Sequence, residues 1–176
     1  MVIVRPITAG DWRPYRELRL KALRESQDAF ASTYELESAR EDDEWEARIA
    51  AVASSKSAQA FFAVKRNEIC GLVWCKASDV EADVVEIFQM WVAPDARGFG
   101  VGRALLERAL SWARGYGAQR VRLGVTVADS PAMRLYKASG FQPVGIPELL
   151  REGSVLMSQA MELNLGSYRE SNIHGL

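Results

Sequence analysis

The spacing of hydrophobic residues changes several times along the chain, and each change indicates a different element. Apolar side chains recur about every three to four positions in four segments, which is typical of amphipathic helices. These segments are Trp12–Leu23, Glu41–Val52, Gly102–Tyr116 and Pro131–Ser139. Between them, short runs rich in β-branched and aromatic residues predict strands. The expected strands are Val2–Pro6, Ala58–Lys65, Glu68–Ala77, Val84–Val92, Arg120–Val127, Phe141–Gly145 and Val155–Leu163. Because helices and strands follow in mixed order, we expect an α/β protein.

Two segments lack a regular spacing of hydrophobic residues. Residues Ser26–Ser38 are polar and irregular, with Phe30 and Tyr34 embedded in them. The last residues, 166–176, are polar and contain glycine. We therefore expect a single domain over residues 1–165, followed by a flexible tail.

Composition narrows the class of protein. Of the 176 residues, 48% are apolar and 26% are charged, as in an ordinary soluble domain. The net charge of −1 disfavours binding to nucleic acid. No apolar run approaches the length of a membrane span, and the apolar stretch at the start is too short for a signal peptide. We expect a cytoplasmic protein that binds neither nucleic acid nor membranes.

The cysteines and the histidine point away from disulfide and metal chemistry. Cys70 and Cys75 are separated by an odd number of positions in one expected strand, so their side chains lie on opposite faces and should not pair. Unpaired thiols fit a reducing compartment. The only histidine, His174, lies in the tail, which leaves no His-rich metal site and no Ser–His or Cys–His catalytic arrangement.

The segment Val84–Arg103 combines a buried strand, a proline stop, alternate glycines and the start of a helix. Glycine lets the backbone approach an anion closely, and the free N–H groups of a helix start favour negative charge. Arg97 and Arg103 add positive charge on either side of the loop. The loop lacks the Gly-Lys-Ser/Thr of a P-loop, and its third glycine, Gly102, comes one position too early for a dinucleotide fingerprint. By itself the loop fits a bare turn as well as a phosphate site.

A second motif downstream decides between these interpretations. The first motif is Arg97-Gly-Phe-Gly100-Val-Gly102, followed by Leu105-Leu106, and the second is Asp129-x-x-Ala132-x-x-Leu135-Tyr136-x-x-x-Gly140-Phe141. In this order and separation they resemble the two cofactor motifs of the GNAT N-acetyltransferase superfamily, and the element order fits that family from Ile3 to Leu163. The resemblance implies a central twisted mixed sheet flanked by helices, with acetyl-CoA as co-substrate and no metal.

The resemblance also implies which residues hold the cofactor. The pantetheine arm would lie along the end of the strand at Met90–Val92, as if adding a strand to the sheet. The implied cofactor contacts are Met90, Trp91, Val92, Arg97, Gly98, Phe99, Gly100, Val101, Gly102, Arg103, Asp129, Ala132 and Tyr136. The family usually has asparagine at the position of Asp129, and an ionised aspartate only accepts hydrogen bonds. The alternative role for Asp129 is that of N-cap of the following helix.

Two residues are candidates for proton transfer. Tyr136 matches the tyrosine of the second family motif and would protonate the departing thiolate, because a phenol and a thiol have similar proton affinities. The alternative is an aromatic ring that packs the helix on the core. Glu86 shares its expected strand face with Val84, Phe88 and Met90, and an isolated carboxylate there indicates a cleft and a general base. The alternative is a solvated or ion-paired strand residue, with Glu35 and Glu37 as rival bases.

The acceptor is harder to predict. Phe30, Tyr34, Glu35 and Glu37 would present an aromatic and acidic wall to a cationic amine. Glu86 is a further candidate contact for this substrate. A surface loop with one or two anchoring aromatics is the alternative. The leading hypothesis is an N-acetyltransferase in which a primary amine of a small molecule or protein attacks acetyl-CoA directly in a ternary complex. The rivals are a non-catalytic CoA-binding sensor on the same fold and a nucleotide-binding regulator. Homodimers are common in the family.

Overall fold

The computed structural model describes residues 1–166, so the expected tail lies outside the described residues apart from Gly166. Within these residues the strands form one eight-stranded sheet in the order β1-β2-β3-β4-β5-β8-β6, with β7 paired to β8. The pairing is antiparallel everywhere except between β4 and β5, which run parallel. The strands are β1 (Val2–Pro6), β2 (Ala58–Lys65), β3 (Glu68–Ala77), β4 (Val84–Val92), β5 (Arg120–Thr126), β6 (Gln142–Pro143), β7 (Glu148–Leu149) and β8 (Met157–Asn164).

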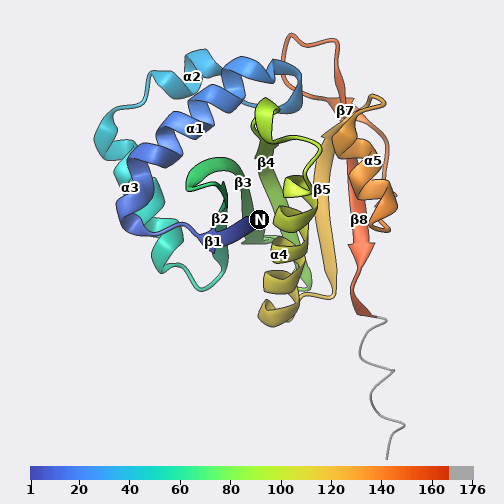
Figure 1. Cartoon of the computed structure of the whole chain (residues 1–176). Helices are drawn as coiled ribbons and strands as arrows, with labels where there is room; N and C mark the ends of the chain where they lie inside the picture. The colour runs from blue at the N-terminus through green and yellow to red at the C-terminus, as the bar shows by residue number, and fades with distance from the viewer. Residues whose placement is uncertain (167–176) are drawn as a thin grey trace, which may run out of the picture.

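Helices cover both faces of this mixed sheet, as predicted. The helices are α1 (Trp12–Glu25), α2 (Tyr34–Ser38), α3 (Asp42–Ser54), α4 (Val101–Tyr116) and α5 (Pro131–Ala138). The first three lie together on one side, where α1 packs on β3 and α3 on β2. On the other side α4 crosses β3 and β4, and α5 packs on α4 and β5 (Figure 1). The sheet is therefore the middle of three layers.

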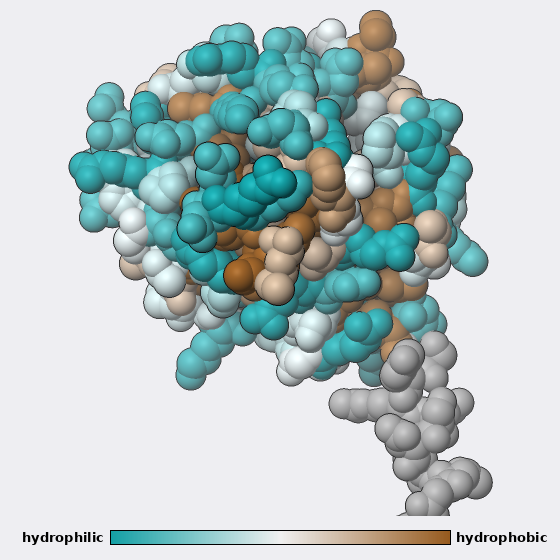
Figure 2. All heavy atoms as spheres, in the orientation of Figure 1, coloured by the Kyte–Doolittle hydropathy of each residue, from teal (hydrophilic) through white to brown (hydrophobic). Residues whose placement is uncertain are grey.

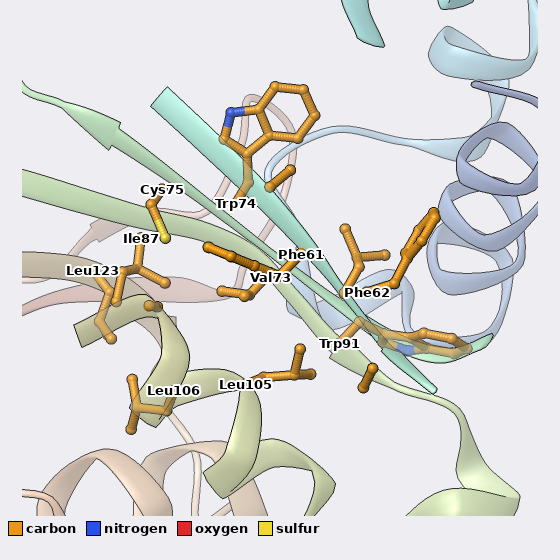
Figure 3. Packing of buried hydrophobic residues seen from close by; sticks show 14 of the residues in the cluster. Phe61, Phe62, Val73, Trp74, Cys75, Ile87, Trp91, Leu105, Leu106 and Leu123 are labelled. Atoms are coloured by element: carbon orange, nitrogen blue, oxygen red, sulfur yellow. The ribbon is translucent and has the colours of Figure 1, made fainter. Parts of the chain in front are cut away.

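The hydrophobic core lies on both faces of the central strands. Leu105 and Leu106 of α4 point to one face, and Cys75 of β3 points toward that same side (Figure 3). Trp74, the neighbour of Cys75, points to the other face, where its ring lies 5.6 Å from that of Tyr15 in α1. The period-two alternation of β3 thus divides its side chains between the two helical layers.

Most expected boundaries agree with the structure within a few residues, and two segments differ. Ser26–Ser38 is not irregular throughout, because Gln27–Ala29 forms a 3-10 turn and Tyr34–Ser38 forms α2. The Thr33 hydroxyl caps α2 by accepting a hydrogen bond from the Leu36 N–H at 3.3 Å. The strand expected over Phe141–Gly145 is reduced to Gln142–Pro143, since Gly145 has a left-handed φ of 69° that ends an extended segment. The short β7 was not predicted.

The two cysteines are both free and buried, as the odd spacing indicates. Burial raises the pKa of the Cys75 thiol to about 12, so this thiol stays protonated. Over residues 1–166, no cluster of three or more His, Cys, Asp or Glu side chains is arranged to hold a metal ion. In the same range no helix has the length and apolar character needed to cross a membrane.

The surface over α4 combines hydrophilic and hydrophobic residues. Figure 2 shows a largely hydrophilic face, with hydrophobic atoms gathered near its centre, around the N-terminus and the helix α4 of Figure 1. Exposed large hydrophobic side chains include Phe99 in the glycine loop and Ile146 and Leu149 near β7. Scattered exposure of this kind is normal for a folded domain.

Candidate active site

The parallel strands β4 and β5 separate halfway along their length. They pair from Val84 and Arg120 to Ile87 and Leu123. Beyond that point β4 continues to Val92 and β5 to Thr126, without further pairing between them in the described part of the chain. Because the other edge of β4 stays paired with β3, the edge that faces β5 has free backbone groups. This gap forms the centre of the candidate site.

A β-bulge in β4 lies at the start of the gap. Trp74 pairs with Phe88 and Leu72 pairs with Trp91, so β4 has one residue more than β3 in between. Gln89 in the bulge has a φ of 54°, a left-handed conformation that costs a non-glycine residue about 1–2 kcal/mol. Non-glycine residues held in such conformations tend to lie at functional sites.

The bulge changes which side chains share a face. Phe88 and Trp91 lie on the face of Trp74, toward α1, whereas Met90 lies on the opposite face. A Cβ added at Gly102 of α4 would come within 3.8 Å of both Met90 and Val92, which places these two side chains beside α4. Glu86 and Phe88 share the face of Trp74, as expected. The expectation that Met90 shares it too was wrong, because strict alternation fails at an inserted residue.

The bulge also decides which backbone groups face the gap. The Ala93 N–H donates to the Cys70 carbonyl at 2.8 Å, so Ala93 bonds to β3. Trp91, two residues earlier and paired with Leu72, faces β3 in the same way. By the alternation of an extended strand, the N–H and C=O groups of Met90 and Val92 point to the gap, where the Val92 carbonyl already accepts a hydrogen bond from Arg97 Nε at 3.0 Å. Of the three residues expected to contact the cofactor along this strand, two thus have backbone groups available to a ligand there.

The glycine loop leads directly from the gap to the start of α4. Gly98 and Gly100 have φ values of 83° and 80°, and Gly100 is the N-cap of the helix. The first intrahelical hydrogen bond runs from the Ala104 N–H to the Gly100 carbonyl at 3.0 Å. The preceding N–H groups of Val101, Gly102 and Arg103 therefore have no intrahelical partner, as in anion sites at helix starts.

The arginines and the phenylalanine of this loop differ in their surroundings. Arg103 is exposed beside the free N–H groups. Arg97 is already engaged, since its Nε donates to the Val92 carbonyl at 3.0 Å and its Nη2 to Glu25 at 3.1 Å. Phe99 is 62% exposed, with Lys65 Nζ 3.2 Å from the centre of its ring. Within residues 1–166 Arg103 forms no ion pair, so it is a better candidate than Arg97 for contact with a phosphate.

Helix α5 closes the site from the side of α4. A Cβ added at Gly102 would lie 3.4 Å from the Leu135 side chain, at ordinary van der Waals distance, so α4 and α5 pack closely at this point. Ala132 is exposed on the first turn. Ser130, not Asp129, is the N-cap, and its hydroxyl accepts a hydrogen bond from the Met133 N–H at 3.1 Å. The capping role expected for Asp129 was wrong, because this side chain is exposed and pairs with Arg134 at 2.8 Å.

Tyr136 on α5 is buried. Only 6% of the residue is exposed, and its ring packs at 5.9 Å against Phe141. Burial raises the pKa of the phenol to about 12. The hydroxyl therefore remains protonated throughout the neutral range and is able to donate a hydrogen bond or a proton there.

Glu86 lies on the other side of the sheet from α4. It is half-buried, between its cross-strand neighbours Lys76 of β3 and Arg122 of β5. Both cations form ion pairs with other carboxylates. Within residues 1–166, Glu86 itself forms no ion pair. The half-buried Glu86 and the exposed Phe88, two residues later, lie on the same face of the sheet.

The residues expected to form an acceptor wall are divided by the fold. Phe30 is buried and covered by the Arg19 guanidinium at 4.8 Å, which fits the alternative of an anchoring aromatic. The Tyr34 ring is covered by Arg24 at 4.4 Å. Glu37 is 1% exposed and bonded to Arg19, so it is not a free base, whereas Glu35 on α2 is exposed.

Long-range hydrogen bonds hold the loop after α1 near the end of β5. The Thr126 hydroxyl donates to the Asp28 carbonyl at 2.6 Å. Arg151, from the loop before β8, donates to the Phe30 carbonyl at 2.8 Å and to that of Gln27 at 3.1 Å. These contacts join three segments that are far apart in the sequence, and local periodicity has no signal for them.

Comparison with known proteins identifies the fold family. The sequence pattern of the acetyltransferase (GNAT) family matches residues 20–141, more than half of the chain. The chain belongs to the GNAT acetyltransferase family. The motifs of the glycine loop and of α5 lie inside the matched region, which confirms the resemblance noted in the sequence.

One curated relative of this GNAT chain is a mycothiol acetyltransferase. The chain is 43% identical over 74 residues to the mycothiol acetyltransferase of Beutenbergia cavernae, a match that covers 42% of this chain and 24% of the relative. The chain thus spans about a quarter of the length of this curated relative.

Solved structures support the GNAT fold over almost the whole chain. The acetyltransferase of the GNAT family from Streptococcus pneumoniae superposes with a TM-score of 0.80 at 21% identity, over 94% of this chain and 100% of that one. An acetyltransferase from Salmonella typhimurium, solved with its cofactor acetyl-CoA, gives a TM-score of 0.77 at 20% identity, over 94% of both chains. At these identities the likeness concerns the fold alone.

Proposed function

We propose that this GNAT protein transfers the acetyl group of acetyl-CoA to a primary amine of a small molecule. One observation carries the proposal: the free edge of β4 at Met90 and Val92 leads directly to the free N–H groups at the start of α4. A pantetheine arm has amide groups that match a free strand edge, and a pyrophosphate matches the helix start. The fold neighbour solved with acetyl-CoA supports this choice of ligand.

The geometry suits direct attack by an amine. The amine nitrogen would bond to the thioester carbonyl carbon while the carbon–sulfur bond breaks. The Met90 N–H, on the gap side of the bulge, is the candidate donor to the carbonyl oxygen as negative charge develops there. Glu86 would accept a proton from the bound ammonium, directly or through water, to give the neutral amine that attacks, and Tyr136 would supply a proton to the departing thiolate.

The acceptor would enter from the face of α1 and α2. Glu86 and Phe88 lie on this face, whereas Tyr136 and the glycine loop lie on the side of α4. The two substrates would therefore approach the gap from opposite faces of the sheet. The mycothiol acetyltransferase among the relatives favours a small-molecule acceptor over a protein.

Acetyl-CoA at about 100 times its dissociation constant should stabilise the protein by about 2.7 kcal/mol. For a chain of this size the midpoint of thermal unfolding should rise by about 5–10 °C. NAD and ATP at the same concentration serve as controls. A rise with acetyl-CoA, followed by thiol release in a screen of amines, would support the proposal. Binding without release for any amine would favour the non-catalytic sensor.

Gly100→Ala tests the phosphate site in the same assay. A Cβ at Gly100 meets no atom within 4 Å, but its φ of 80° would cost alanine about 1–2 kcal/mol and shift the loop. The variant should fold and lose most of the stabilisation by acetyl-CoA. Gly115→Ala is the matched control, because Gly115 lies in α4 with open space and without a left-handed φ. Equal ligand stabilisation in both variants would place the phosphates elsewhere.

The variant Glu86→Gln tests whether Glu86 acts as the general base. Turnover should fall by about 10²-fold near pH 7 and by less at higher pH, where more of the amine is already neutral. Glu35→Gln is the control, since Glu35 is the exposed rival on α2. Steady-state rates from about pH 6 to about pH 9 would show the difference. A loss in the Glu35 variant alone, or equal losses at every pH, would remove Glu86 from the role of base.

A further inference from the structure

The bulge residue Gln89 is held by a side chain that neither cofactor motif contains. The Tyr15 hydroxyl of α1 donates a hydrogen bond to Gln89 Oε1 at 2.6 Å, between residues 74 positions apart in the sequence. Within residues 1–166 the Tyr15 hydroxyl makes no other hydrogen bond. It connects the first helix directly to the strained residue of β4.

Tyr15 is itself rigidly placed. The residue is 0% exposed, and its ring lies 5.9 Å from that of Trp45 in α3 and 5.6 Å from that of Trp74 in β3. Three elements therefore fix the position of the hydroxyl oxygen. Burial raises the pKa of this phenol above its usual value, so the hydroxyl stays a donor at all neutral pH values. Tyr15→Phe would retain this ring packing and remove only the hydroxyl and its hydrogen bond to Gln89.

Gln89 alone connects the hydrogen bond from Tyr15 to the proposed site of acetyl transfer. Gln89 has a φ of 54° and directly precedes Met90, whose N–H faces the gap between β4 and β5. The direction of that N–H depends on the backbone angles of Gln89. A glutamine has no intrinsic preference for a left-handed φ, so an outside contact must help to stabilise it.

We infer that Tyr15 is a positioning residue: through Gln89 it holds the Met90 N–H where the thioester carbonyl oxygen accepts a hydrogen bond. The inference rests on the proposed acetyl transfer. It concerns the geometry of one donor, and it assigns neither proton transfer nor substrate contact to Tyr15. Loss of the phenol hydroxyl should loosen the donor without removing it, and leave binding of the CoA portion to the glycine loop intact.

The first experiment observes the bound thioester itself. Acetyl-CoA labelled with ¹³C at the carbonyl is bound to the wild-type protein and to the Tyr15→Phe variant, and saturation of each is verified by thermal shift. The carbonyl resonance should move downfield on binding to the wild type, as it does for a hydrogen-bonded carbonyl, and by about half as much or less in the variant. Tyr116→Phe, which removes an exposed phenol hydroxyl at the end of α4, should behave as wild type.

The second experiment separates positioning from general packing. With an amine found in the screen, Tyr15→Phe should lower kcat about tenfold and leave the KM for acetyl-CoA within about twofold. The same change is then made in a Gln89→Gly background, where glycine adopts the left-handed φ without a side-chain contact. There Tyr15→Phe should have no further effect on kcat, because the contact on which it acts is gone.

Each outcome has a distinct meaning. A downfield shift in Tyr15→Phe as large as that in the wild type, or an equal loss of kcat in both backgrounds, would overturn the positioning role and leave the proposed acetyl transfer intact. A wild-type protein that does not bind acetyl-CoA would overturn the proposed function, and the positioning role with it.

Discussion

We expect Tyr136→Phe to lower turnover by about 10²-fold while the affinity for acetyl-CoA changes little. The ring is 6% exposed and packs on Phe141, and phenylalanine retains this packing. The lost hydroxyl removes the proton that would go to the departing thiolate. Steady-state release of thiol measures the first effect, and thermal shift with acetyl-CoA measures the second.

The pH dependence of turnover provides a second test of the role of Tyr136. Because burial raises the pKa of Tyr136 to about 12, the phenol is protonated at every pH at which the protein is assayed. The ratio of wild-type to variant turnover should therefore stay constant from about pH 6 to about pH 10. Tyr116→Phe is the control for deletion of an exposed phenol hydroxyl. Full turnover in Tyr136→Phe would leave the ring with a packing role only.

The largest effect on stability is expected for Glu37→Gln. Glu37 Oε2 lies 2.7 Å from Arg19 Nη2, Oε1 lies 3.1 Å from Arg19 Nε, and both residues are nearly fully buried. Arg40 adds a second cation at 3.1 Å. Removing one partner of a buried ion pair leaves an uncompensated charge and costs about 3–5 kcal/mol. The midpoint of thermal unfolding should fall by about 10 °C or more.

The pH dependence of this loss has a defined sign. Burial by itself would raise the pKa of Glu37, but the hydrogen bond and charge of Arg19 outweigh it, and the pKa is lowered in the folded protein. The ionised carboxylate therefore contributes its full stability above its unfolded pKa of about 4.5 and loses it as the pH falls through the lower, folded value. The difference between wild type and Glu37→Gln should shrink in acid.

Two further variants test whether the loss of stability comes from the ion pair between Arg19 and Glu37. Glu35→Gln changes an exposed carboxylate on the same short helix and should alter stability by no more than about 0.5 kcal/mol. Arg19→Met combined with Glu37→Leu removes both charges and should recover part of the loss, since a buried pair is often replaceable by apolar groups. If Glu37→Gln is as stable as wild type at pH 7, the pair does not hold α2 on α1.

The sequence predicts the structure best where the signal lies within one helix, strand or loop. The helical period of α4 predicted its buried face, because Leu105, Leu106 and Leu110 face the sheet as a direct consequence of their spacing. The alternate glycines predicted a loop before the helix, and the structure has this loop, with left-handed φ values at Gly98 and Gly100. The two motifs together predicted the family.

The sequence was less informative about which side chains meet across elements. Arg97 was expected to be free for a phosphate, but it pairs with Glu25, 72 residues earlier in the chain. Glu37 was considered as a catalytic base, but burial beside Arg19 makes it a structural ion. Neither contact has a local signal, because each depends on how α1 is placed on the sheet.

The sequence by itself determined the helices, the strands and the glycine loop at the start of α4, because these depend on side-chain spacing and backbone freedom within a few neighbouring residues. Only the tertiary structure decided the face of Met90, the left-handed φ of Gln89 and the bond from Tyr15 that supports it. A bulge exists only relative to the partner strand, and the hydrogen bond exists only once α1 packs on that sheet. The part of the candidate site that is proposed to bind the cofactor can therefore be predicted from the sequence, whereas the placement of the proposed reacting groups arises from long-range pairing.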